Sequence, residues 1–262
     1  MKEANNTTVI ALVGKGGVGK TSISALTVRL LAERYPDKRI LAIDADPAVG
    51  LATALGMEAE STVDDIRREF VASAENGDTG AAIEMLGEAK YRLFDALVER
   101  GNVSFLAIGR PESAGCYCKV NAYLKEIIRL IAGSFDYVVI DGEAGIEQIN
   151  RRVMERVTHL LLVSDASRKG LQVVQTIHAV AKNLVHFEKA GLIVNRMPEL
   201  SMQDRLSTGD IPLLSCIGDD KAMSMSDMLG STVYSLEPTT EIYRKVETAL
   251  VNLGILEGGN PK

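Results

Sequence analysis

Short apolar runs recur along the chain and alternate with stretches in which apolar residues follow a helical period. Each run is continuously apolar, which is typical of strands in a parallel sheet that is covered on both faces. The pattern predicts seven strands, at Val9–Val13, Arg39–Asp44, Val103–Ile108, Tyr137–Asp141, His159–Val163, Leu192–Asn195 and Leu213–Ile217.

Helical stretches between these runs make the repeating unit strand–helix–strand, which predicts an α/β fold. We expect a three-layer, doubly wound, mostly parallel sheet flanked by helices. The length suits one domain over residues 1–262, and the charge-rich residues at about 57–102 are interpreted as a helical insertion on its surface. A final packing helix is expected over Thr240–Leu253, where four apolar residues share one face.

A glycine-rich string, Val-Gly-Lys-Gly-Gly-Val-Gly-Lys-Thr-Ser, links the first predicted strand to a helical stretch. Such glycines let backbone N–H groups turn inward around phosphate oxygens, and the helix N-terminus adds positive potential. Lys20 would neutralise the terminal phosphates, and Thr21 would ligate Mg²⁺. A plain turn is the alternative, but the strand–loop–helix context favours a P-loop NTPase fold of Rossmann-like type. The predicted nucleotide-binding residues here are Gly14, Gly16, Gly17, Val18, Gly19, Lys20, Thr21 and Ser22.

Carboxylates follow two of the predicted strands. Asp44-Ala45-Asp46-Pro47 ends the second strand, and Asp141 closes the fourth before Gly142-Glu143-Ala144-Gly145. Near bound phosphates, one carboxylate can hold a Mg²⁺-bound water while another orients the attacking water. Asp141 is placed like a Walker B carboxylate, where it can meet the Mg²⁺ shell. Ordinary polar loop residues are the alternative reading.

A second lysine, Lys15, stands at the mouth of the loop although phosphate binding does not require it. In this the chain resembles the deviant Walker A ATPases, which include MinD, ParA and the nitrogenase iron protein. The resemblance implies that Lys15 reaches across a dimer interface to the partner's nucleotide and acts in catalysis with Lys20 and Asp46. It also implies that Asp44 lies on the metal side and that Asp46 positions the water.

Asn195 and Arg196 follow the predicted strand Leu192–Asn195. In the same family an Asn at this place reads the adenine edge, because its amide both donates and accepts hydrogen bonds. We therefore predict that both residues bind the nucleotide. A capping Asn after a strand is the alternative.

Two cysteines, Cys116 and Cys118, form a CxC pair after the strand Val103–Ile108. Two thiolates do not complete a tetrahedral metal site, but a symmetric dimer would supply the other two. We predict a dimer-bridging site for Ni²⁺ or Zn²⁺, the ions that such ligands favour; two structural cysteines are the alternative. Cys216 lies on a predicted strand and is expected in the core.

Four segments together, Gly14–Thr21, Asp44–Pro47, Gly115–Cys118 and Asp141–Glu147, resemble the CooC-type nickel-insertion ATPases of carbon monoxide dehydrogenase maturation. The resemblance implies an ATP-hydrolysing homodimer whose closure is coupled to nickel handling for a client such as carbon monoxide dehydrogenase or acetyl-CoA synthase. The chain departs from the family at Gly142 and Asp165. The nucleotide-binding domain is shared with cobyrinic acid a,c-diamide synthases, but this chain is too short for their glutaminase module.

Composition and charge argue against nucleic-acid binding, membrane insertion and secretion. A net charge of −6 argues against a large phosphate-backbone footprint and so against nucleic acid as a partner. No apolar stretch approaches the roughly 18 residues of a membrane span, and the polar N-terminus lacks the apolar core of a secretory signal. We expect a cytoplasmic protein without membrane insertion.

Two rival functions stay open. A partition or positioning ATPase would need a basic DNA-binding face or a membrane-seeking C-terminal helix. In the predicted C-terminal helix, charged residues surround a narrow apolar stripe, which suits a helix packed on the core better than one on a membrane. A reductase like the nitrogenase iron protein would bridge its dimer with a [4Fe–4S] cluster. In that family the cluster cysteines lie far apart in sequence, whereas Cys116 and Cys118 are one residue apart.

Overall fold

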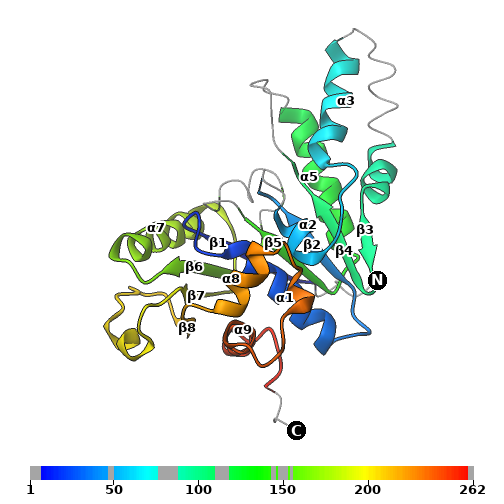
Figure 1. Ribbon diagram of the computed structural model, residues 1–262. Helices are drawn as coiled ribbons and strands as arrows, with labels where there is room; N and C mark the ends of the chain where they lie inside the picture. Colours follow the sequence, from blue (N-terminus) through cyan, green and yellow to red (C-terminus); the bar gives the residue numbers. More distant parts are fainter. Residues whose placement is uncertain are drawn as a thin grey trace.

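The computed structural model describes residues 7–46, 50–75, 88–109, 118–142, 146, 153 and 156–258. Within these ranges the strands form one sheet in the order β3-β4-β2-β5-β1-β6-β7-β8 (Figure 1). All neighbouring strands except β3 and β4 run parallel. The strands are β1 (Thr8–Gly14), β2 (Ile40–Asp44), β3 (Val98–Arg100), β4 (Val103–Ala107), β5 (Tyr137–Asp141), β6 (His159–Asp165), β7 (Lys189–Asn195) and β8 (Leu213–Cys216).

The seven predicted strands are confirmed as β1, β2 and β4 to β8, with ends that shift by a few residues. Strand β3 was not predicted. It has only three residues, two of them exposed and charged, and it pairs antiparallel with β4 across a turn at Gly101 (φ 61°). A short, polar edge strand has no apolar run to reveal it.

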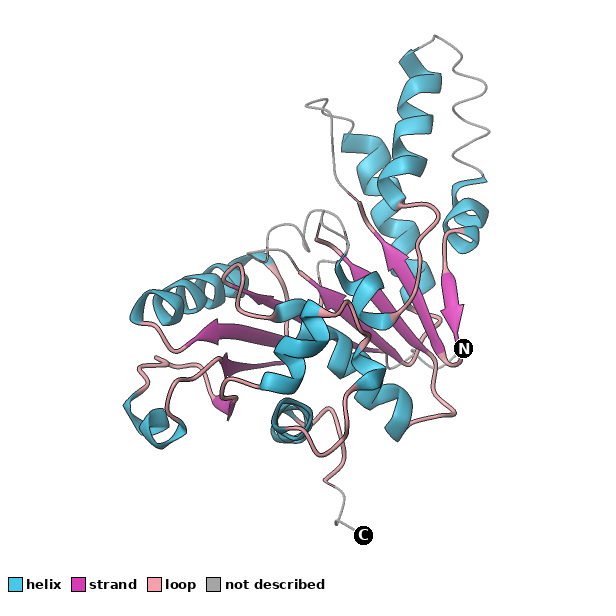
Figure 2. Ribbon diagram, in the orientation of Figure 1, coloured by secondary structure: helices cyan, strands magenta, loops and turns pink. Residues whose placement is uncertain are grey.

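Helices cover both faces of the sheet and give the three predicted layers (Figure 2). Along β1, Ile10 and Leu12 pack into one hydrophobic core while Ala11 and Val13 pack into the other. Strands buried on both faces need no polar alternation, which explains their continuous apolar sequence. The helices are α1 (Lys20–Arg34), α2 (Gly50–Leu55), α3 (Val63–Glu75), α5 (Cys118–Ala132), α7 (Arg168–Leu184), α8 (Lys221–Met228) and α9 (Glu241–Leu253), with short 3₁₀ helices η1 (Leu200–Arg205) and η2 (Val233–Ser235).

The two helical layers draw on different parts of the chain. Helices α1, α2 and α9 share one core, and α3, α5 and α7 share the other. The predicted final helix is α9, whose apolar face is buried and which ends at Gly254 in the left-handed conformation (φ 79°). Within residues 57–102, α3 and a helical stretch at 88–95 place Phe70 and Leu93 in the same core as α5. No helix in the described ranges is long and apolar enough to cross a membrane.

Asp220 ties α8 to α9 at their N-termini. Its two carboxylate oxygens accept the backbone N–H groups of Met223 (3.0 Å) and Ile242 (2.9 Å). One side chain therefore caps two helices, each of which has unpaired N–H groups at its start.

Replacing Asp220 by Ala should lower the free energy of unfolding by about 2 kcal/mol, since each lost cap is worth roughly 1 kcal/mol. Chemical denaturation measures this. Asp219→Ala, at the exposed neighbouring position, is the matched control and should change stability little. Equal effects of the two substitutions would show that Asp220 is not a double cap.

Candidate functional site

The loop between β1 and α1 requires glycine where the sequence has it. A Cβ on Gly14 would lie 2.0 Å from the carbonyl oxygen of Val163 on β6, so no other residue permits this approach. Gly17 (φ 76°) and Gly19 (φ 88°) adopt the left-handed conformation, and α1 begins directly after Gly19. An added Cβ on Gly16 or Gly17 would meet no atom within 4 Å, so the mouth of the loop is open.

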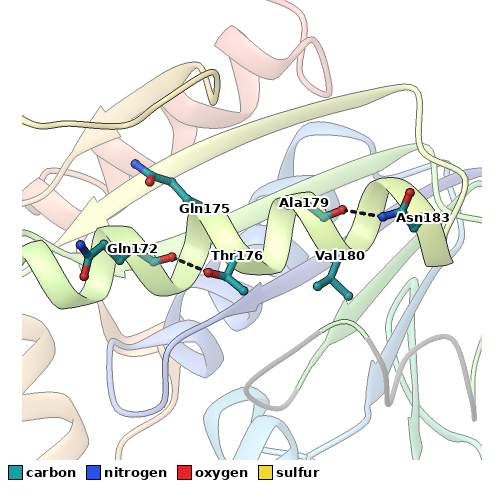
Figure 3. A pocket seen from close by; sticks show the side chains of 6 residues that line it. All are labelled: Gln172, Gln175, Thr176, Ala179, Val180 and Asn183. Carbon is teal, nitrogen blue, oxygen red and sulfur yellow. Dashed lines mark hydrogen bonds between the residues drawn. The ribbon is translucent and has the colours of Figure 1, made fainter.

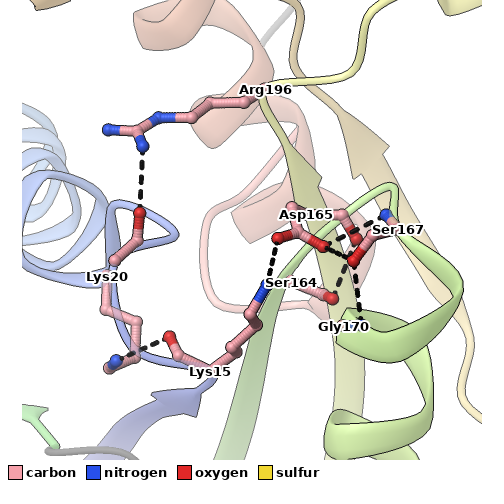
Figure 4. A network of polar contacts seen from close by, with 8 residues as sticks. Lys15, Lys20, Ser164, Asp165, Ser167, Gly170 and Arg196 are labelled. Atoms are coloured by element: carbon pink, nitrogen blue, oxygen red, sulfur yellow. Dashed lines mark hydrogen bonds and ion pairs between the residues drawn. The ribbon is translucent and has the colours of Figure 1, made fainter.

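Three side chains hold carbonyl groups of this loop. Lys20 Nζ donates to the carbonyl of Lys15 (3.0 Å), and Arg196 Nη1 donates to that of Gly17 (3.0 Å) (Figure 4). Asn195 Nδ2 donates to the carbonyl of Val18 (2.8 Å). In a planar trans peptide the next residue's N–H points away from the carbonyl. The N–H groups of Gly16, Val18 and Gly19 are therefore directed away from these side chains, as an anion-binding loop requires.

Asp44 and Asp141 lie side by side as register partners on β2 and β5, at 0% and 1% exposure. Asp44 accepts the backbone N–H groups of Asp46 (3.0 Å) and Leu51 (2.9 Å). Ser24 of α1 donates its hydroxyl to Asp141 Oδ1 (2.8 Å). The Thr21 hydroxyl also lies near this carboxyl, but Asp141 Oδ2 is buried and makes no hydrogen bond of good geometry with any described residue.

Burial makes both carboxyls hard to ionise. Burial, together with the negative charge of the neighbouring Asp141, raises the pKa of Asp44 to about 7 against the two backbone N–H groups, which lower it. Burial likewise raises the pKa of Asp141 to about 6, against the hydroxyls of Thr21 and Ser24 and the ammonium of Lys20. The cause is the loss of hydration around negative charge. A cation placed between the two carboxylates would offset their negative charge and so lower both pKa values.

These donors fit Mg²⁺. The ion is commonly held by one or two carboxylates together with substrate phosphates and water, without an all-protein cage. Asp44, Asp141 and Thr21 supply hard oxygen atoms next to the loop, and one of these, Asp141 Oδ2, has no partner among the described residues. Over those residues no group of three or more His, Cys, Asp or Glu side chains could hold a metal by itself.

Asp46 joins the same cluster. Its side chain is partly exposed, and it lies close enough to raise the pKa values of both Asp44 and Asp141. The structure thus brings three predicted carboxylates together at the carboxyl ends of β2 and β5. Asp46, the most exposed of the three, has the access that a water-positioning residue needs.

Lys15 makes an ion pair within its own chain. Its Nζ lies 2.7 Å from Asp165 Oδ2, at the end of β6. Burial would raise the pKa of Asp165, but hydrogen bonds from Lys15 and Ser167 outweigh it and hold that pKa below its ordinary range. In the sequence, Asp165 was noted only as a departure from the family pattern, and its ion pair with Lys15 was not predicted.

The CxC pair lies at the edge of the described ranges. Cys116 is outside them, and Cys118 is the first residue of α5. The last described residue before the pair is Gly109 (φ 83°), which follows β4. It lies against the side chains of Thr62 and Asp64. Cys216 is buried on β8, as expected, and burial raises the pKa of its thiol.

A shallow hollow on the outer face of α7 lies apart from this site (Figure 3). Its lining residues all belong to α7. Thr176 donates to the carbonyl of Gln172 (3.0 Å) and Asn183 to that of Ala179 (3.3 Å), while Gln175 donates to the carbonyl of Ser207 (2.8 Å). A ligand site gathers polar groups from several elements, and this hollow does not.

Residues 9–233 match the family profile described as the CobQ/CobB/MinD/ParA nucleotide binding domain. The chain belongs to this family. It is 35% identical over 243 residues to an uncharacterized ATP-binding protein of Methanocaldococcus jannaschii, covering 91% of this chain and 95% of that one. It is also 30% identical over 245 residues to the carbon monoxide dehydrogenase accessory protein CooC of Rhodospirillum rubrum, covering 87% and 90%.

Solved structures of the family share the fold. A ParA family ATPase from Chlorobium tepidum matches with a TM-score of 0.69 at 21% identity, over 93% of this chain and 99% of the other. The septum site-determining protein MinD from Pyrococcus horikoshii, complexed with Mg-ADP, matches with a TM-score of 0.64 at 22% identity, over 93% and 94%. With the family established, the protein is a P-loop ATPase of the MinD/ParA type, for which a nucleotide with Mg²⁺ is the expected ligand.

The raised pKa values predict a pH-dependent stability. An acid whose pKa is higher in the folded than in the unfolded state binds its proton more tightly when folded, so stability falls as the pH rises from the unfolded towards the folded value. For Asp44 this window runs from about pH 4 to about pH 7. The free energy of unfolding without nucleotide should therefore decrease across it, by about 1.4 kcal/mol per unit of pKa difference.

Asp44→Asn should flatten this decrease, because its side chain does not ionise. Urea denaturation at a series of pH values measures the slope. Asp37→Asn, in the exposed turn before the amino end of β2, is the control. An Asp44→Asn protein with the wild-type slope would contradict the assignment of this buried carboxyl.

Proposed function

We propose that this ATPase is a dimeric accessory protein whose nucleotide-driven closure handles nickel for the maturation of a metalloenzyme of the carbon monoxide dehydrogenase or acetyl-CoA synthase type. One combination carries the proposal. Lys15 and the Cys116/Cys118 pair occur in the same chain, and a symmetric partner would give both a function. The similarity to the Rhodospirillum rubrum accessory protein supports the same client class.

In this proposal, residues 1–262 form one ATPase domain, with a helical insertion at about 57–102, that acts in the cytoplasm. The loop N–H groups and Lys20 bind the phosphates of ATP, while Asp44, Asp141 and Thr21 would hold Mg²⁺. That ion, when bound, offsets the negative charge that develops on the phosphates. Asp46 orients the attacking water.

Asn195, the last residue of β7, and Arg196, which follows it, are the residues proposed to bind the nucleotide base. Both already contact the P-loop, through the carbonyls of Val18 and Gly17. We propose that they also meet the base, as the family resemblance implies. Their hydrogen bonds to the loop would then connect base recognition with phosphate binding.

The metal is the cargo of the proposed cycle. Closure would bring the Cys116 and Cys118 thiolates of two protomers together into a four-sulfur site, the number that tetrahedral coordination requires. Thiolate ligands suit Ni²⁺ and Zn²⁺, and ligand type alone does not select between them. Hydrolysis reopens the dimer and releases the ion to the client.

A positioning ATPase is the second candidate, because septum site-determining MinD proteins are among the relatives. That of Synechocystis is 25% identical over 235 residues, covering 86% of this chain and 80% of that one. Membrane attachment through α9 would need a free apolar face, but the apolar residues of α9 are buried against α1 and β8. This observation counts against membrane attachment through α9.

Lys15→Ala should bind ATP but fail to form the closed dimer, and hydrolysis should slow by about 10³-fold, the lower range for losing a cation supplied in trans to a phosphoryl transfer. Sedimentation velocity with Mg-ATP and steady-state turnover test this. Lys90→Ala, at an exposed site in the stretch 88–95, is the control. A Lys15→Ala protein that dimerises and turns over normally would refute the proposed role.

Replacing both Cys116 and Cys118 by Ser should reduce bound Ni²⁺ or Zn²⁺ to background in equilibrium dialysis with ATP, while ATP affinity stays unchanged. The reason is that a serine hydroxyl does not replace a thiolate ligand for these ions. Cys216→Ser is the matched control and should retain the metal. Metal retained at wild-type stoichiometry in the double variant would remove the CxC proposal.

A further inference from the structure

We propose that Ser24 is a positioning residue, which orients the Asp141 carboxyl and so leaves its Oδ2 atom for the Mg²⁺ ion. The inference rests on the proposed function in one respect, because it takes Asp141 to be a ligand of the nucleotide's Mg²⁺. It adds a residue of α1 that lies beyond the P-loop motif. The observation behind it is the hydrogen bond from the Ser24 hydroxyl to Asp141 Oδ1, at 2.8 Å.

The Ser24 hydroxyl does not bond to its own helix. Inside a helix, serine and threonine hydroxyls often donate to the carbonyl four residues earlier. Thr27 of α1 does so, from its hydroxyl to the carbonyl of Ile23 (2.8 Å). Ser24 is as fully buried as Thr27, at 0% exposure, yet its hydroxyl donates across to β5. It therefore connects the helix that follows the P-loop with the carboxylate at the end of a strand.

The backbone of Asp141 is already fixed by the two neighbouring strands. Its carbonyl accepts the N–H of Ala45, directly after β2, at 2.9 Å, and the N–H of Gly142 donates to the carbonyl of Leu12 on β1, also at 2.9 Å. The carboxyl group can still rotate, because the last torsion of an aspartate side chain has broad minima. A donor held on α1 selects one of these orientations.

The selected orientation gives the two carboxylate oxygens different surroundings. Oδ1 accepts from Ser24, while Oδ2 is buried and makes no hydrogen bond of good geometry with any described residue. A buried polar atom without a partner is unfavourable unless a ligand comes to it. The Thr21 hydroxyl near this carboxyl and Asp44 beside it on β2 are the other oxygen donors proposed for Mg²⁺. Hydrogen bonds from behind a metal ligand commonly orient it in this way.

Helix formation and core packing do not require serine at this position. Alanine is the better helix former, and burying a hydroxyl costs free energy unless the hydroxyl is hydrogen-bonded. Among the described residues, Asp141 is the partner that the structure gives to the Ser24 hydroxyl. The interaction with the carboxylate is thus the physical reason for a serine there.

Ser24→Ala tests the proposal through Mg²⁺ and not through the nucleotide. With a fluorescent ADP analogue bound, the Mg²⁺ concentration at the midpoint of the titration should rise by at least about 10-fold, the usual loss when a hydrogen bond behind a metal ligand is removed. The affinity for the analogue in EDTA should equal that of the wild type, because the P-loop is unchanged. ADP is used because the proposed dimer closure needs ATP, so the result does not depend on closure.

Thr27→Val is the matched control, since it removes another fully buried hydroxyl of α1 that does not contact Asp141. It should leave the Mg²⁺ midpoint unchanged. Ser24→Cys is made in parallel so that the result does not depend on the folding of one variant. Its thiol is a weak donor, and its midpoint should lie between those of the wild type and Ser24→Ala.

Asp141→Asn separates this inference from the Mg²⁺ site on which it rests. In the Asp141→Asn background, Ser24→Ala should add nothing, because the carboxylate that it orients is gone. A Ser24→Ala protein with the wild-type midpoint, while Asp141→Asn loses the Mg²⁺ response, would overturn this inference and leave the Mg²⁺ site intact. An Asp141→Asn protein with a wild-type response would instead overturn the assignment of Asp141 in the proposed function.

Discussion

The hydrogen bonds that hold the P-loop carbonyls are the interactions on which the rest of this site depends. Lys20, Arg196 and Asn195 each donate a hydrogen bond to one of these carbonyls, at 2.8 to 3.0 Å. A planar peptide that turns its carbonyl one way turns the following N–H the other way. The loop therefore keeps its donors on the phosphate side before any ligand arrives, and its glycines provide the backbone conformations that this needs.

A second constraint is the burial of two carboxylates beside that loop. Asp44 and Asp141 share a register position on neighbouring strands, and burial raises the pKa values of both. Such an arrangement is unfavourable for a structure without a cation and favourable for one that receives a divalent ion with its substrate. The same feature thus explains a destabilising element in the sheet and is the basis for proposing a Mg²⁺ site there.

The sequence predicted those parts that depend on local pattern. Continuous apolar runs identified the parallel strands, and glycine spacing identified the P-loop and its helix. Strand β3 was missed because Val98-Glu99-Arg100 offers no apolar run. The contacts of Ser24 with Asp141 and of Lys15 with Asp165 join residues 117 and 150 positions apart, so only the folded sheet brings them together. In the sequence, the position of Ser24 one helical turn after Thr21 could have indicated its contact with Asp141.

Family membership and the P-loop geometry establish an ATPase, and the metal-handling dimer is the claim built on them. Native mass spectrometry of the wild-type protein, with Ni²⁺ or Zn²⁺ present and with or without Mg-ATP, tests that claim most directly, because it reports oligomeric state and bound metal in the same species. The account predicts a shift to a dimer on adding Mg-ATP, with one metal ion bound per dimer. A protein that binds ATP yet shows neither the dimer nor the metal would contradict it.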